Sequence, residues 1–66
     1  MNARDFLDLK GREAAEQVAV KAGTTYAYFY QIARGNRRPS VKLAEKLVKA
    51  SNQELDFVAL LRSARS

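Results

Sequence analysis

The chain contains no cysteine, and at this length that absence restricts the fold more than any other feature. With 66 residues, it lies near the lower limit at which a domain folds on its hydrophobic core alone. Disulfides and zinc fingers, two common supports of such small domains, are both excluded. Helix-favouring residues dominate the sequence, with few glycines and a single proline. We therefore expect one all-α domain over residues 1–66, stabilised by packing of its helices.

Apolar residues recur at helical spacing in about five short segments. Asn2, Thr25 and Ser40 stand where N-caps are expected, because their side chains can accept hydrogen bonds from the first turn of a helix. Gly11 and Gly35 stand where helices should stop, since glycine readily adopts the left-handed conformation that ends many helices. The sequence predicts helices over residues 3–10, 12–22, 26–34 and 41–50 and a last element within residues 52–63.

The last element is the least certain in type, because two periodicities fit it. Residues 51–54 read Ser-Asn-Gln-Glu, the form of a capping box, which predicts a helix opening here. At a period of two, the apolar side chains of residues 55–61 fit one face of a strand equally well, and we favour the helix because of the capping box. Its large apolar residues either complete the core or form a self-complementary patch for a two-fold dimer. Arg62 and Arg65 are expected to be solvated.

Charge is concentrated in one part of the chain. No acidic residue occurs between Gln17 and Ala44, whereas the remainder carries seven basic and seven acidic residues. The basic residues of this acid-free stretch account for the whole net charge of +5, and they are Lys21, Arg34, Arg37, Arg38 and Lys42. Basic charge gathered on a segment that can present a helix is typical of a nucleic-acid-binding protein.

Composition also argues against several other classes of protein. The chain has neither histidine nor cysteine, so the commonest general base and the commonest metal ligands are missing. We expect no enzyme, no bound metal and no cofactor. Apolar runs stay far below membrane-spanning length, and the charged N-terminal residues do not resemble a signal peptide. A cytoplasmic protein without membrane contact is therefore expected.

Residues 18–32 predict two helices that meet at a tight turn. Gly23 allows the backbone to reverse, and Ala19 is small enough for a second helix to pass close by. Apolar side chains at helical spacing would lock the two helices together, and these are Val18, Ala22, Phe29 and Ile32. The pattern predicts a helix-turn-helix whose second helix covers residues 26–34.

The outward side of that second helix carries side chains suited to reading a DNA major groove. Gln31 can form a bidentate pair with adenine, and Arg34 can reach a guanine or a phosphate. Tyr28 is expected at the rim of the core. The predicted base contacts are Tyr26, Ala27, Tyr30, Gln31 and Arg34. The predicted contacts to the DNA backbone are Lys21, Thr25, Arg37 and Arg38.

Residues 15–50 resemble the helix-turn-helix core of phage Cro and cI-type repressors, a lambda-repressor-like fold. The resemblance rests on Ala19, on Gly23-Thr24-Thr25, on Phe29 and Ile32, and on Gly35 followed by basic residues and a helix. It implies a dimer on a double-stranded DNA operator, with the second helix of the motif in the major groove. It also implies that Arg37 and Arg38 belong to a loop contacting the DNA backbone.

These observations predict a sequence-specific transcriptional regulator that acts by occupying its operator. The DNA-binding antitoxin of a toxin–antitoxin pair would carry the same features. A helical adaptor whose basic face binds an acidic protein is the alternative from another class. RNA binding by tyrosine stacking fits less well, because the tyrosines lie on a helix and not on an open sheet.

Overall fold

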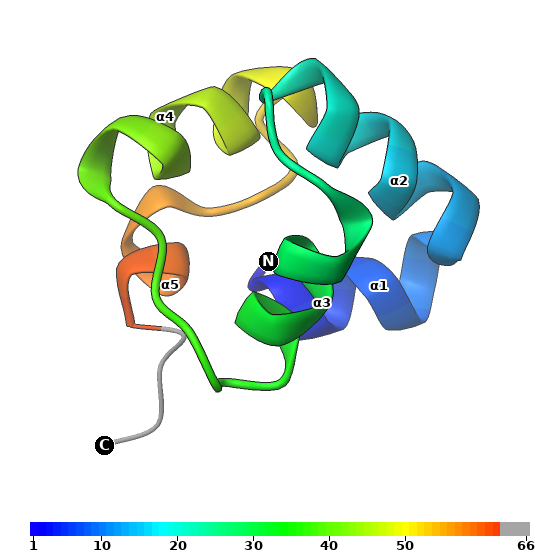
Figure 1. Cartoon of the computed structure of the whole chain (residues 1–66), viewed down its shortest axis with the longest axis horizontal. Helices are drawn as coiled ribbons and strands as arrows, with labels where there is room; N and C mark the ends of the chain where they lie inside the picture. The colour runs from blue at the N-terminus through cyan, green and yellow to red at the C-terminus, as the bar shows by residue number, and fades with distance from the viewer. Residues whose placement is uncertain (63–66) are drawn as a thin grey trace.

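Five α-helices make up the fold in this computed structural model, which describes residues 1–62 (Figure 1). They are α1 (Ala3–Lys10), α2 (Arg12–Lys21), α3 (Tyr26–Ala33), α4 (Val41–Ala50) and α5 (Phe57–Leu61). The described residues contain no strand, so the all-α prediction is confirmed for them. No helix among them has the length and apolar character needed to cross a membrane.

The first four helices begin and end within one residue of their predicted bounds. Asn2, Thr25 and Ser40 each accept a hydrogen bond from the backbone N–H three residues later, at 2.7, 3.1 and 3.1 Å. These bonds satisfy N–H groups that have no partner inside the first turn. The N-cap predictions are therefore confirmed, and local side-chain chemistry is sufficient to explain where α1, α3 and α4 begin.

Helices α2 and α3 end in the same way, with a glycine in the left-handed region. Gly23 has φ +83° and Gly35 has φ +81°. After α2, the N–H of Thr24 donates to the carbonyl of Ala19 at 2.9 Å, and after α3 the N–H of Asn36 donates to the carbonyl of Gln31 at 2.9 Å. This is the Schellman arrangement, which turns the chain sharply while satisfying the last carbonyls of a helix.

The prediction of a capping box at residues 51–54 is wrong. Ser51 belongs to the end of α4: its N–H donates to the carbonyl of Leu47 at 3.0 Å, and its hydroxyl donates to the carbonyl of Val48 at 2.9 Å. Asn52 then takes φ +56° and Gln53 φ +70°, so α4 closes with the same Schellman arrangement. Asparagine is the residue that most often replaces glycine at this position.

The last helix begins later than predicted. Asp56 is its N-cap and accepts a hydrogen bond from the N–H of Ala59 at 2.9 Å. Glu54, the expected second member of the capping box, instead pairs with Lys10 of α1 at 2.9 Å. A helix was correctly preferred over a strand for residues 57–61. Residue 63 of the predicted element and Arg65 lie outside the described residues.

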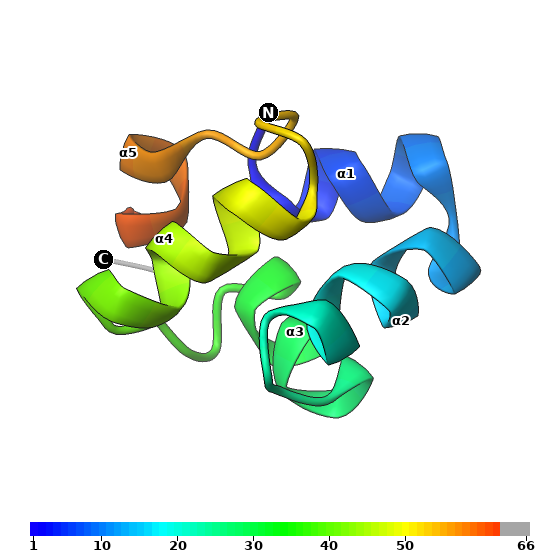
Figure 2. The ribbon, with the colours of Figure 1, turned by 90° about the horizontal axis from the view of Figure 1, so that it is seen from above.

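The core is built around one side of α3. Phe29 and Ile32 are both 0% exposed, and Phe6 of α1 meets the Phe29 ring edge-on at 6.1 Å between centroids. Helices α1 and α2 both pack on α3, while α4 packs on α2 and α5. Leu47 of α4 and Leu60 of α5 are also fully buried. In Figure 2, α3 lies along the lower edge of the molecule, so the side opposite its buried residues faces outward.

Candidate nucleic-acid interface

All nine residues predicted to contact DNA are at least partly exposed. On α3, the exposed side lies opposite Phe29 and Ile32, as the helical phase predicts. Tyr26 and Gln31 are partly buried. Ala27, Arg34 and Tyr30, which is 37% exposed, are open to solvent. The structure thus brings the five predicted base-contacting residues onto one outward side of α3 and its C-cap.

Two tyrosines and two arginines form a row along this side of α3. The rings of Tyr26 and Tyr30 lie 6.0 Å apart. The guanidinium of Arg12 stands 4.7 Å from the centre of the Tyr26 ring, and that of Arg34 stands 5.7 Å from the Tyr30 ring. Arg34 also donates to the Tyr30 hydroxyl at 3.3 Å. Because cation–π and ring contacts restrict these long side chains, the row has a defined shape before any ligand binds.

Two cations beside this row, Arg12 and Arg4, were not predicted from the sequence. Arg12 was missed because it precedes the acid-free stretch, and only the packing of α2 on α3 brings it over Tyr26. Arg4 of α1 shares a surface hollow with Tyr30 and Arg34. Neither position carries a signal in the sequence, because the contacts join residues from different helices.

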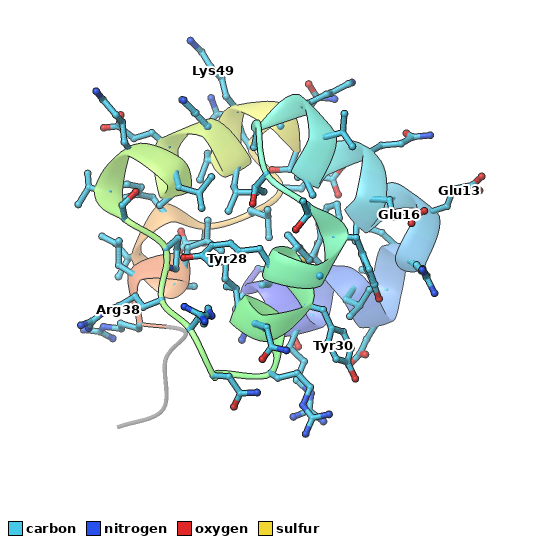
Figure 3. The ribbon with its side chains drawn as sticks, viewed as in Figure 1. Glu13, Glu16, Tyr28, Tyr30, Arg38 and Lys49 are labelled. Atoms are coloured by element: carbon cyan, nitrogen blue, oxygen red, sulfur yellow. The ribbon has the colours of Figure 1, made fainter. Side chains whose placement is uncertain are left out.

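The basic loop after α3 is held by aromatic and apolar contacts. The guanidinium of Arg37 stands 5.8 Å from the ring of Tyr28, which is partly buried against the core as predicted. Pro39 is buried and anchors the far end of the loop. Arg38 is exposed between them, and Figure 3 shows its side chain extending away from the ribbon. The loop therefore presents two arginines from a fixed backbone.

The remaining predicted backbone contacts lie at the other end of α3. Lys21 lines a hollow together with Thr25 and Tyr26, so it is near the N-terminus of the helix. The Thr25 hydroxyl oxygen accepts from the N–H of Tyr28, which leaves its proton free to donate elsewhere. Lys21 and the arginines of residues 34–38 consequently bracket α3 from its two ends.

The acid-free stretch of sequence does not form an acid-free surface. Glu16 and Asp8 reach the two hollows that border α3, and Figure 3 shows Glu16 with Glu13 along the outer side of α2. Glu16 lies 3.7 Å from Arg12, and Asp8 lies 4.0 Å from Arg4. Within residues 1–62, by contrast, Arg34, Arg37 and Arg38 form no ion pair. Three cations without an ion pair therefore follow one another closely at the C-terminal end of α3, and Lys21 at the other end has no ion pair among the described residues either.

Gln31, one of the predicted base contacts, is hydrogen-bonded to the loop that follows α3. Its side-chain oxygen accepts a hydrogen bond from Nδ2 of Asn36 at 2.8 Å. Its backbone carbonyl accepts from the N–H groups of Asn36 at 2.9 Å and Arg37 at 3.3 Å. The loop after α3 is therefore attached to Gln31 through both the backbone and the side chain.

The described residues contain no cluster of three or more metal-binding side chains. Comparison with models of protein families, with curated proteins and with solved structures gave no match to this chain.

Proposed function

We propose that this protein is a sequence-specific regulator that binds double-stranded DNA through α3, with α2 and α3 acting as a helix-turn-helix. The observation that carries the proposal is the outward side of α3. It presents tyrosine, alanine and glutamine side chains opposite a fully buried side, and arginines stand at its ends. Cations that can grip phosphates thus flank uncharged groups that can read bases.

Each group on this side of α3 has a partner in a B-DNA major groove, which is wide enough to admit a helix. Gln31 can pair with the edge of adenine, and Ala27 can rest against a thymine methyl. Arg34 can reach the O6 and N7 atoms of guanine. The tyrosine hydroxyls can donate to phosphates or bases. Arg37 and Arg38 would contact the DNA backbone beside the groove and add affinity by releasing counterions.

The proposed mechanism is occupancy of an operator in the cytoplasm, with neither catalysis nor a cofactor. A phage-type repressor and a DNA-binding antitoxin would use the surface in the same way, so the proposal covers both. The similarity of residues 15–50 to Cro and cI-type repressors supports the same mode of binding.

Selection from a pool of random duplexes tests the proposal. The full chain is expected to enrich one short motif, because paired side chains and bases discriminate by about 1–3 kcal/mol per base pair. Sequencing of the bound fraction measures this. Enrichment of no motif, with binding to duplex no tighter than to heparin at physiological salt, would favour the adaptor with a basic face and overturn the proposal.

We further propose that the protein binds DNA as a dimer through the exposed part of α4 and α5. These helices pack together, and each exposes a valine: Val41 is 56% exposed and Val58 is 54% exposed. Phe57 and Leu61 are only partly buried. One domain of this size covers limited DNA surface, and a two-fold dimer on two half-sites multiplies the affinity.

Val58→Lys is expected to abolish this dimer while leaving the fold intact, because it places a charge in an apolar interface but not in the core. Analytical ultracentrifugation with saturating operator duplex measures the stoichiometry. Leu9→Lys is the matched control, since Leu9 of α1 is 73% exposed and lies outside α4 and α5. A wild-type protein that binds each half-site as an independent monomer would contradict the dimer.

A further inference from the structure

We infer that Asn36 is a positioning residue that determines which base Gln31 reads. The inference rests on the proposed function and deepens it, because Asn36 was assigned no role by its sequence. Its side-chain amide donates to Oε1 of Gln31 at 2.8 Å, and both residues are accessible at the C-terminal end of the outward side of α3.

The backbone makes this pairing a built feature of the helix end. In a Schellman arrangement, the backbone N–H of the residue after the left-handed one donates a hydrogen bond to the carbonyl five positions earlier. After α3 this bond joins Asn36 to Gln31. The corresponding bonds join Thr24 to Ala19 after α2 and Gln53 to Val48 after α4. Only after α3 do both partners carry a carboxamide.

In this hydrogen bond Asn36 is the donor, and Gln31 then presents one order of donor and acceptor. A glutamine amide has two N–H donors and an oxygen with two lone pairs, and a half-turn about its last bond exchanges their positions. With Oε1 held by Asn36, the amino group and one oxygen lone pair remain free in a single order. Pairing with adenine requires such an order, since N7 must receive a proton while N6 donates one.

Without Asn36, the amide could present either order. The reversed order matches other groups on the base-pair edges, such as thymine O4 next to adenine N6, or guanine O6 next to cytosine N4. Asn36 therefore contributes to specificity without itself needing to contact a base. Orienting the amide before binding also reduces the conformational entropy lost on the DNA.

Two substitutions separate this role from a general one. Asn36→Ala removes the donor, so the preference for one base at the position read by Gln31 should relax. A bidentate pair supplies a preference of about 5- to 150-fold, and we expect this preference to fall by up to about tenfold. Asn36→Asp removes the donor and adds an acceptor. Gln31 must then turn its amino group toward residue 36 and present its oxygen outward. The preferred base at that position should therefore change and not merely weaken.

The experiment is selection of the same randomised duplex pool by the wild type and the variants, with Gln31→Ala marking the base pair concerned. Asn52→Asp is the matched control for charge, because Asn52 is exposed at the far end of α4. It should preserve the wild-type motif. Both Asn36 variants should unfold within about 4 °C of the wild type, as expected for an exposed side chain, so that altered preference is not a sign of misfolding.

The possible outcomes test the role of Asn36 separately from DNA binding itself. A change confined to the base pair marked by Gln31→Ala supports the role of Asn36. A wild-type motif retained unchanged by both Asn36 variants overturns that role and leaves DNA binding standing. A uniform loss of affinity at every position equally overturns it, since it would show a contact with the DNA backbone only. If the wild type itself enriches no motif, the proposed function fails and this inference fails with it.

Discussion

Gln31→Ala is expected to weaken binding to the selected operator by about 1–3 kcal/mol and to relax the preference at one base pair. The reason is that truncation removes a side chain able to form two hydrogen bonds with a single base, while the alanine adds none. Gln31 is partly exposed and its backbone carbonyl would keep its bonds to residues 36 and 37, so the helix end should persist. Titration of the selected duplex and of its single-base variants measures the effect.

Two controls give this result its meaning. Leu9→Ala truncates a side chain of α1 that is 73% exposed and lines neither hollow bordering α3, and it should leave affinity within about 0.5 kcal/mol of the wild type. Arg38→Ala should weaken binding to every duplex alike and lower the slope of log affinity against log salt by about one. If Gln31→Ala behaved like Arg38→Ala, the assigned orientation of α3 on the DNA would be wrong.

Phe29→Ala is expected to lower the free energy of unfolding by about 3–5 kcal/mol, the usual loss for a large aromatic side chain removed from a core. Phe29 is fully buried, and its ring contacts that of Phe6 where α1 packs on α3. A domain this small has only about 3–10 kcal/mol of total stability. Much of the variant population should therefore be unfolded, which denaturant titration followed by circular dichroism would reveal.

Phe57→Ala is the matched control, because it removes the same side chain from a partly buried position on α5. Its cost should be clearly smaller, since less apolar surface is lost from the interior and the site can collapse or admit water. Equal losses for the two variants would contradict the assignment of the core to the inner side of α3. DNA binding by Phe29→Ala should fall only in proportion to its folded fraction.

Local signals were strong enough to predict most of the helical framework. An N-cap acts through a hydrogen bond that spans three residues, so Asn2, Thr25 and Ser40 could be recognised without any tertiary information. The inner and outer sides of α3 followed from the position of Phe29 and Ile32 at helical spacing. These predictions succeeded because cause and effect both lie within one turn of the helix.

The prediction of a capping box at residues 51–54 failed because the same residues are also compatible with the C-terminal end of the preceding helix. Ser51 was interpreted as an N-cap, but its N–H donates to a carbonyl of α4. Its hydroxyl donates to a second carbonyl of α4 and accepts a hydrogen bond from the N–H of Leu55 at 3.0 Å. The carboxylate of Glu54 forms an ion pair with Lys10 of α1 instead of capping a helix. The carbonyl of Glu54 accepts from the amino group of Met1 at 2.9 Å, and that of Met1 accepts from the N–H of Asp56 at 2.8 Å. The local N-cap Asp56 sets where α5 begins, and contacts with the N-terminal segment hold the residues before it.

By itself the sequence determined the first four helices with their bounds, the core-facing residues of α2 and α3 and the outward side of α3, and it favoured a helix for the last element, because spacing and capping act over a few residues. Tertiary structure alone decided the surroundings of that side. The ion pairs of Arg12 with Glu16 and of Arg4 with Asp8 are local, because each spans four residues of one helix. Only the packing of the helices brought Arg12 and Arg4 beside the tyrosines. Such contacts join different helices, and their formation depends on how the helices pack.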